Sequence, residues 1–113
     1  MKYVLYILVT VLLPVQLNAQ TDSLINALKE TASENTIEVD ERIAAYNQLT
    51  TVYYNIDIKK ARAYCKNAEQ LAQTDTLSLG MCNVYVNRAL LDFSKGFYNG
   101  AIENLVKARK ILT

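Results

Sequence analysis

Histidine and tryptophan are absent from this chain of 113 residues, which contains one proline, three glycines and two cysteines. Without histidine, the commonest general base and the commonest metal ligand are missing. The carboxylate pairs Asp40–Glu41 and Glu34–Glu38 stand at expected helix starts, where negative charge interacts favourably with the helix dipole. No nucleophile or phosphate-binding loop accompanies them. We therefore expect no catalytic residue, no cofactor and no bound metal, and a protein that is not an enzyme.

The first 19 residues differ in composition from the rest of the chain. Lys2 is followed by an apolar run from Tyr3 to Val15, and polar residues begin again around Ala19. One basic residue, a short apolar core and a small residue at the cut are typical of a secretory signal peptide. The run is shorter than the roughly 20 apolar residues of a membrane span. We expect a signal peptide over residues 1–19 and membrane contact through it alone, with retention as an anchor as the alternative.

Charge of neither sign dominates, since 12 basic residues face 11 acidic ones. Cleavage after Ala19 removes only Lys2 from this count and leaves equal numbers. A nucleic acid or an anionic membrane surface selects for a strongly basic protein. Neither is expected as a partner. The remaining residues 20–113 can bury one modest core, enough for a single small domain.

The two cysteines, Cys65 and Cys82, form an even pair in a chain expected to be exported, which leaves a disulfide open. Each lies on the apolar side of an expected helix. Free cysteine in such a place behaves as a small hydrophobic residue. We expect two buried free thiols, with the disulfide as the alternative.

Helical periodicity continues from residue 20 to the end, and no segment shows the alternation of a β-strand. We therefore expect an all-α fold. Short polar breaks separate five expected helices, at residues 23–31, 41–54, 58–72, 77–95 and 98–112. Asp40 and Asp57 are expected to cap the helices that follow them. Gly96 is expected to adopt the left-handed conformation that ends the fourth helix.

Two stretches of the chain, residues 58–69 and 98–109, repeat each other at an offset of 40 residues. The matching positions are Ala61, Cys65 and Ala68 in the first stretch and Ala101, Leu105 and Ala108 in the second. A period of this size with small residues at helical spacing indicates stacked helix pairs. Alanine on both sides of a helix contact permits the closest approach of the two axes. The alternative is an unrelated helical bundle whose alanines match by chance.

The second stretch and the residues before it resemble the tetratricopeptide repeat (TPR) family. The segment Gly96-Phe97-Tyr98-Asn99-Gly100-Ala101 is similar to the turn and second helix of that family, and Tyr85 stands where its first helix prefers a large residue. Arg88 and Asp92 depart from the family pattern. The resemblance implies that a set of small and apolar residues packs the repeats: Ala61, Cys65, Ala68, Ala89, Gly96, Ala101, Leu105 and Ala108.

The fold that the resemblance implies is a short α-solenoid over residues 40–113, with TPR-like helix pairs at 41–73 and 77–113. An N-terminal helix and linker at 20–36 would precede it. In the family, the first helix of each pair lines a concave groove that holds peptides or protein segments. The positions that match this groove are Tyr46, Asn47, Thr50, Tyr53, Asn83, Asn87 and Leu90. Asn47 and Asn87 occupy equivalent places, and a carboxamide supplies both a donor and an acceptor. The alternative is that these side chains are solvated or cap the local backbone.

The function that the resemblance implies is a non-catalytic protein- or peptide-binding scaffold, exported to the periplasm or cell envelope of a Gram-negative bacterium. The alternative is the truncated input region of a TPR-containing signal-transduction protein, such as a histidine kinase or a transcriptional regulator. Stacks of this kind usually need three or more repeats and a polar capping helix. Further repeats of a longer chain, or self-association through the uncapped last helix, are therefore expected beside a protein or peptide partner.

Overall fold

A computed structural model describes residues 20–74 and 78–113, and the expected signal peptide lies outside this part of the chain. All regular structure in the described residues is α-helical, as expected. Residues 20–33 form the first helix. It is followed by α2 (Val39–Tyr53), α3 (Ile58–Ala72), α4 (Leu79–Ser94) and α5 (Tyr98–Leu112). None of the described helices is long and apolar enough to cross a membrane.

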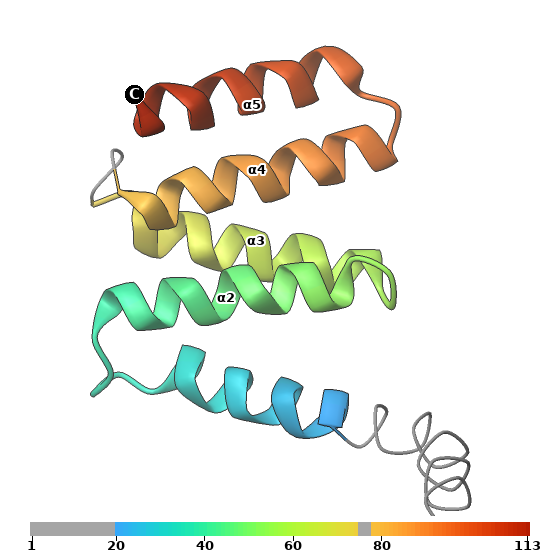
Figure 1. Ribbon diagram of the computed structural model, residues 1–113. Helices are drawn as coiled ribbons and strands as arrows, with labels where there is room; N and C mark the ends of the chain where they lie inside the picture. The colour runs from blue at the N-terminus through green and yellow to red at the C-terminus, as the bar shows by residue number, and fades with distance from the viewer. Residues whose placement is uncertain (1–19, 75–77) are drawn as a thin grey trace, which may run out of the picture.

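The helices form two antiparallel hairpins, in which α2 packs against α3 and α4 packs against α5 (Figure 1). The hairpins meet because α4 contacts both α3 and α2. The helix of residues 20–33 lies beside α2 and contributes Ile25, Leu28 and Ala32 to the core that contains Leu49 and Val84. One continuous core therefore extends from the first helix to α4.

Alanine and cysteine are frequent among the residues buried between the helices. Six of the eight expected packing residues are buried: Ala61, Cys65, Ala68, Ala89, Ala101 and Ala108. Cys65 and Cys82 are both buried free thiols, so the expectation of unpaired cysteines is confirmed. The Cys82 thiol lies 3.6 Å from the carbonyl oxygen of Ala108, across the α4–α5 contact.

Side-chain caps fix two of the helix starts. The Asp57 carboxylate accepts hydrogen bonds from the backbone N–H groups of Lys59 (3.1 Å) and Lys60 (3.3 Å), which confirms the expected cap of α3. The side-chain cap of α4 was not predicted from the sequence. There the Ser78 hydroxyl accepts a hydrogen bond from the backbone N–H of Met81 at 3.1 Å. The expected start of this helix at residue 77 lies outside the described residues.

The prediction that Asp40 caps α2 is wrong. The helix begins two residues earlier than expected, at Val39 instead of Glu41, and the residue before it, Glu38, makes no side-chain cap hydrogen bond. Asp40 lies inside the first turn. Its carboxylate there stabilises the helix through the dipole, since the positive end of the dipole lies at the N-terminus.

Gly96 ends α4 in the left-handed conformation, with φ of 81°, as expected. Its backbone N–H donates to the carbonyl oxygen of Phe93 at 3.0 Å, and that of Phe97 donates to the carbonyl oxygen of Asp92 at 2.9 Å. This pair of bonds is the Schellman motif, which satisfies carbonyl groups that the helix end leaves free. The turn between α4 and α5 therefore depends on glycine.

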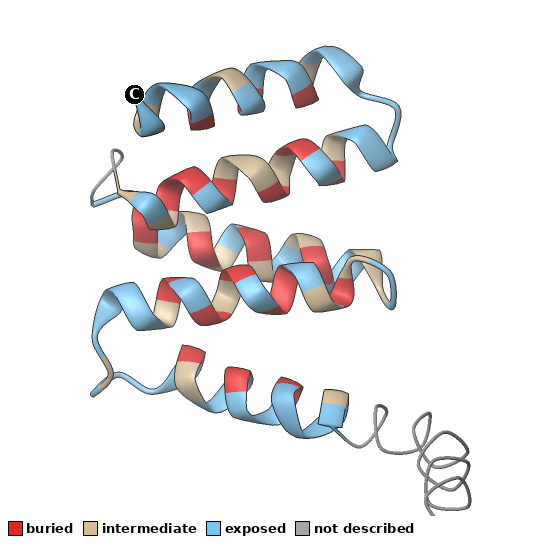
Figure 2. Cartoon of the chain, in the orientation of Figure 1, coloured by how far each residue is buried: buried red, intermediate tan, exposed pale blue. Residues whose placement is uncertain are grey.

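The prediction that Leu105 packs the repeats is wrong. Leu105 is 50% exposed, and Ile102 and Leu112 of the same helix are 59% and 68% exposed. Leu105 corresponds to Cys65, which is buried because α4 covers that side of α3. Among the described residues no helix covers the matching side of α5, which is coloured as exposed in Figure 2. Only Ala101, Asn104 and Ala108 of α5 are buried.

Candidate functional site

A groove runs between α2 and α4. Its main cavity has a volume of about 400 Å³, and an adjoining cavity of about 270 Å³ shares Ala44, Asn47 and Asn83 with it. Four residues that the sequence assigned to a groove line the main cavity: Asn47, Asn83, Asn87 and Leu90. The other lining residues of the main cavity are Ala44, Gln48, Thr51 and Val86. We refer to the two cavities together as the α2/α4 groove.

Asn47 and Asn87 connect the two walls of this groove. The Asn87 side-chain nitrogen Nδ2 donates to both the backbone oxygen and the side-chain oxygen Oδ1 of Asn47, each at 3.3 Å. Asn47 Nδ2 in turn donates to the carbonyl oxygen of Gly80 at 3.2 Å. Both asparagines are buried. These hydrogen bonds therefore hold α2 against α4. From the sequence, the two roles considered for the asparagines were ligand binding and solvation or local capping, and this role is neither of them.

Other amide groups of the groove remain available. Gln48 and Asn83 are exposed, and within residues 20–74 and 78–113 their side chains make no hydrogen bond. Asn87 Oδ1 likewise receives no donor from this part of the chain. A carboxamide has two donor hydrogens and an acceptor oxygen. The groove thus offers two complete amides and one additional acceptor to a ligand.

Tyr46, Thr50 and Tyr53 do not line the α2/α4 groove. The Tyr64 ring of α3 lies 6.2 Å from the Tyr46 ring and 5.5 Å from the Tyr53 ring between centroids, so both tyrosines pack toward α3. Lys29 Nζ of the first helix lies 5.8 Å from the centroid of the Tyr53 ring. The Thr50 hydroxyl donates to the carbonyl oxygen of Tyr46 at 2.9 Å and is buried. These three residues stabilise the helix packing.

The groove is nearly free of charge. No ionisable side chain lines the main cavity, and Asp40 is the one acidic or basic residue that lines the adjoining cavity. Small apolar surfaces of Ala44, Val86 and Leu90 lie among the amides. Such a surface can hydrogen-bond a neutral polar backbone and cover small apolar side chains, and it has no cation with which to hold an anionic group.

Sequence reasoning missed the groove residues Ala44, Gln48 and Thr51. The signal is present for Ala44 and Thr51, which lie three residues before and four residues after Asn47 and so share its helix face. Choosing the face by the position of Asn47 alone would have found these two but not Gln48, which directly follows Asn47.

Two observations bear on thiol and metal chemistry in the described residues. Burial raises the pKa of the Cys65 thiol to about 11, so this thiol is protonated at neutral pH. Residues 20–74 and 78–113 contain no group of three or more cysteine, aspartate and glutamate side chains placed to hold a metal ion. What the groove geometry can do is bind.

No protein-family model, no curated protein and no solved structure matches this chain. A functional assignment therefore rests on the α2/α4 groove and its contacts.

Proposed function

We propose that this protein is a non-catalytic peptide-binding module of the cell envelope, built from two TPR-like helix pairs and exported by the signal peptide at residues 1–19. The observation that carries the proposal is the α2/α4 groove, with its exposed and unbonded amides of Gln48 and Asn83. The 40-residue offset between Asn47 and Asn87 supports it, since equivalent positions of two helix pairs meet in this groove.

An extended, uncharged peptide segment is the ligand that fits this surface. A peptide backbone offers alternating N–H and C=O groups, and side-chain amides can bond to both. Backbone hydrogen bonds give affinity, while shallow apolar surfaces select among side chains. From Asp40 to Thr51 the wall of α2 is about 16 Å long at the helical rise. That length accommodates about five residues of an extended chain.

The decisive experiment selects ligands from a displayed library of random peptides on the full chain and then compares two alanine variants. Asn83→Ala removes an exposed groove amide, and we expect it to weaken binding of a selected neutral peptide roughly two- to tenfold, the effect of one hydrogen bond. Gln70→Ala removes an equally exposed amide from α3, outside the groove. We expect no change in affinity from it.

Failure to enrich any neutral peptide would contradict the proposal. So would equal affinities of the Asn83→Ala and Gln70→Ala variants for the selected peptide. Circular dichroism of both variants serves as the folding control, since neither side chain makes a hydrogen bond within residues 20–74 and 78–113.

A second proposed function is the input region of a longer signal-transduction protein of the TPR type. The exposed side of α5 favours it, because Ile102, Leu105 and Leu112 form an apolar surface that a following helix would cover. The mass of the protein in a cell-envelope fraction separates the two proposals. A mass matching residues 20–113 supports the free module, and a much larger mass supports the input region.

A further inference from the structure

A further cavity, of about 260 Å³, lies between α3 and α4, apart from the two cavities of the α2/α4 groove. Eight residues line it: Arg62, Cys65, Lys66 and Glu69 from α3, Arg88, Leu91 and Asp92 from α4, and Lys95 directly after α4. The lining thus carries four basic and two acidic side chains. In a chain with almost no net charge, this is a local excess of positive charge.

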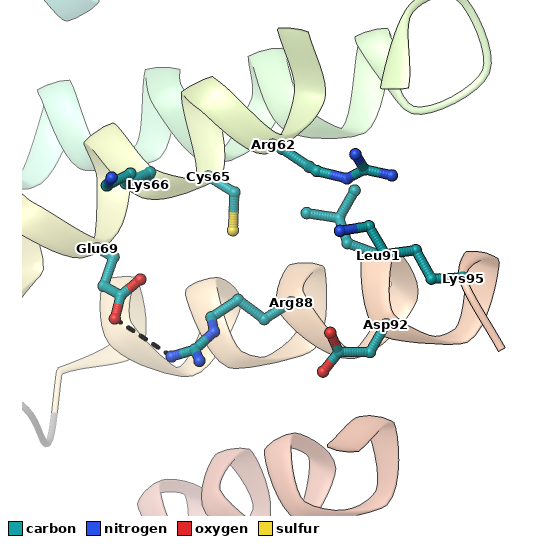
Figure 3. A pocket seen from close by; sticks show the side chains of 8 residues that line it. All are labelled: Arg62, Cys65, Lys66, Glu69, Arg88, Leu91, Asp92 and Lys95. Carbon is teal, nitrogen blue, oxygen red and sulfur yellow. Dashed lines mark hydrogen bonds and ion pairs between the residues drawn. The ribbon is translucent and has the colours of Figure 1, made fainter. Parts of the chain in front are cut away.

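Both carboxylates of the cavity already have partners. Glu69 Oε1 lies 3.2 Å from Arg88 Nη1 in an ion pair. Asp92 Oδ2 accepts a hydrogen bond from Asn104 Nδ2 of α5 at 2.9 Å. Figure 3 shows the Glu69–Arg88 pair at one end of the cavity and the Asp92 carboxylate turned toward α5. Neither carboxylate bonds to Arg62, Lys66 or Lys95.

Arg62 is the residue that points to a ligand. Its Nε atom is buried and has no hydrogen-bond partner. Buried polar atoms in folded proteins are almost always hydrogen-bonded, so an exception requires an explanation. Within residues 20–74 and 78–113, the guanidinium of Arg62 and the ammonium of Lys66 have no acceptor. Lys95 Nζ has only the Phe97 ring, whose centroid is 6.0 Å away.

Arg62 and Lys95 lie toward the same end of the cavity, whereas Figure 3 shows the Lys66 side chain at the opposite end, on the Glu69 side. Figure 3 shows the Lys95 side chain reaching back along α4 to the region between Arg62 and Leu91. The cavity floor is apolar, because Cys65 and Leu91 are both buried. Arginine presents a planar fork of donors that matches a carboxylate or phosphate, and lysine adds a point charge.

We propose that the α3/α4 cavity is a binding site for an oxyanion, a carboxylate or phosphate group of a small ligand held by Arg62 and Lys95. The cavity volume limits the ligand to a small organic acid or a free phosphate. The site lies on the other side of α4 from the α2/α4 groove and uses none of its residues. It therefore stands whether or not the groove binds peptides.

The test is a titration of the isotope-labelled full chain with inorganic phosphate and, separately, with succinate, followed by two-dimensional amide NMR at constant ionic strength. We expect saturable shifts centred on residues 62–69 and 88–95 with at least one of the two anions. The stronger of the two identifies the oxyanion as phosphate or carboxylate. Arg62→Gln should weaken this binding by about tenfold or more, since it removes a charged hydrogen-bond donor.

Two further variants keep the test decisive. Lys95→Gln alters an exposed side chain and should also weaken binding, even if Arg62→Gln does not fold. Arg109→Gln removes the same kind of charge from the exposed side of α5 and should leave affinity unchanged. The proposal is overturned by the absence of saturation with both anions, or by equal shifts around Arg109. It is also overturned if a folded Arg62→Gln or Lys95→Gln variant binds as tightly as the unaltered protein.

Discussion

Leu49→Ala is expected to lower the free energy of unfolding by about 2–5 kcal/mol, the range for truncating a buried leucine to alanine. Leu49 is 0% exposed and lies in the core that joins the first helix, α2, α3 and α4. The truncation removes apolar contacts and leaves a cavity that several helices border. Because these helices pack against one another, they cannot move inward to fill the cavity. Equilibrium unfolding in urea, followed by circular dichroism, measures the change.

Leu105→Ala is the matched control for this prediction, because the chemistry is the same and Leu105 is half exposed on the outer side of α5. We expect Leu105→Ala to lower the free energy of unfolding by less than about 1 kcal/mol, as for most surface substitutions. Similar losses for the two variants would contradict the arrangement of helices described above.

Asn47→Ala is expected to cost about 1–3 kcal/mol of folding free energy, the cost of leaving buried polar groups without a partner. The substitution removes the donor to the Gly80 carbonyl oxygen and the side-chain acceptor for Asn87 Nδ2. Because both bonds cross between helices, the loss falls on the α2–α4 contact. Urea unfolding again provides the measurement.

Asn83→Ala is the control for Asn47→Ala. Asn83 is exposed and has no hydrogen bond within the described residues, so its truncation should change stability by no more than about 0.5 kcal/mol. The Asn47→Ala variant thus tests how the groove is stabilised, and the Asn83→Ala variant tests its binding surface. An Asn47→Ala variant as stable as Asn83→Ala would show that the hydrogen bonds between Asn47 and α4 contribute nothing measurable.

The helices themselves were largely predictable from the sequence. The bounds of α3 and α5 agree with the expected ranges because clear breaks precede both, a capping Asp57 and the turn at Gly96. The start of α2 was misplaced because Glu38 and Asp40 are both acidic residues suited to a helix start. Local sequence identifies such a region, whereas the first hydrogen-bonded residue depends on how the preceding loop packs.

The groove was predictable only in part, for a reason that α2 illustrates. This helix contacts the first helix, α3 and α4, so most of its circumference is in contact with neighbours. Periodicity indicates which residues are buried, and it does not indicate which neighbour buries them. Tyr46 and Tyr53 were therefore assigned to the groove, although they pack toward α3. Asn47, which directly follows Tyr46, does line the groove.

The exposed side of α5 shows a further limit of repeat reasoning. The match between Cys65 and Leu105 predicts that the two residues lie on equivalent faces of their helices. It does not predict that a neighbouring helix covers both faces. Cys65 is 3% exposed and Leu105 is 50% exposed for this reason alone. The arginine and lysine residues of the α3/α4 cavity were not predicted to form a site, because charge on a helix gives no sign of a cavity between two helices.

The measurement that tests the central claim most directly is amide NMR mapping of a selected neutral peptide on the full chain. The proposed function predicts that the largest shifts fall on residues 44–51 of α2 and 83–90 of α4, the two walls of the α2/α4 groove. Small shifts are predicted for α5. If the largest shifts instead fall on the exposed side of α5, around Ile102 and Leu105, the groove is not the peptide site and the claim is wrong.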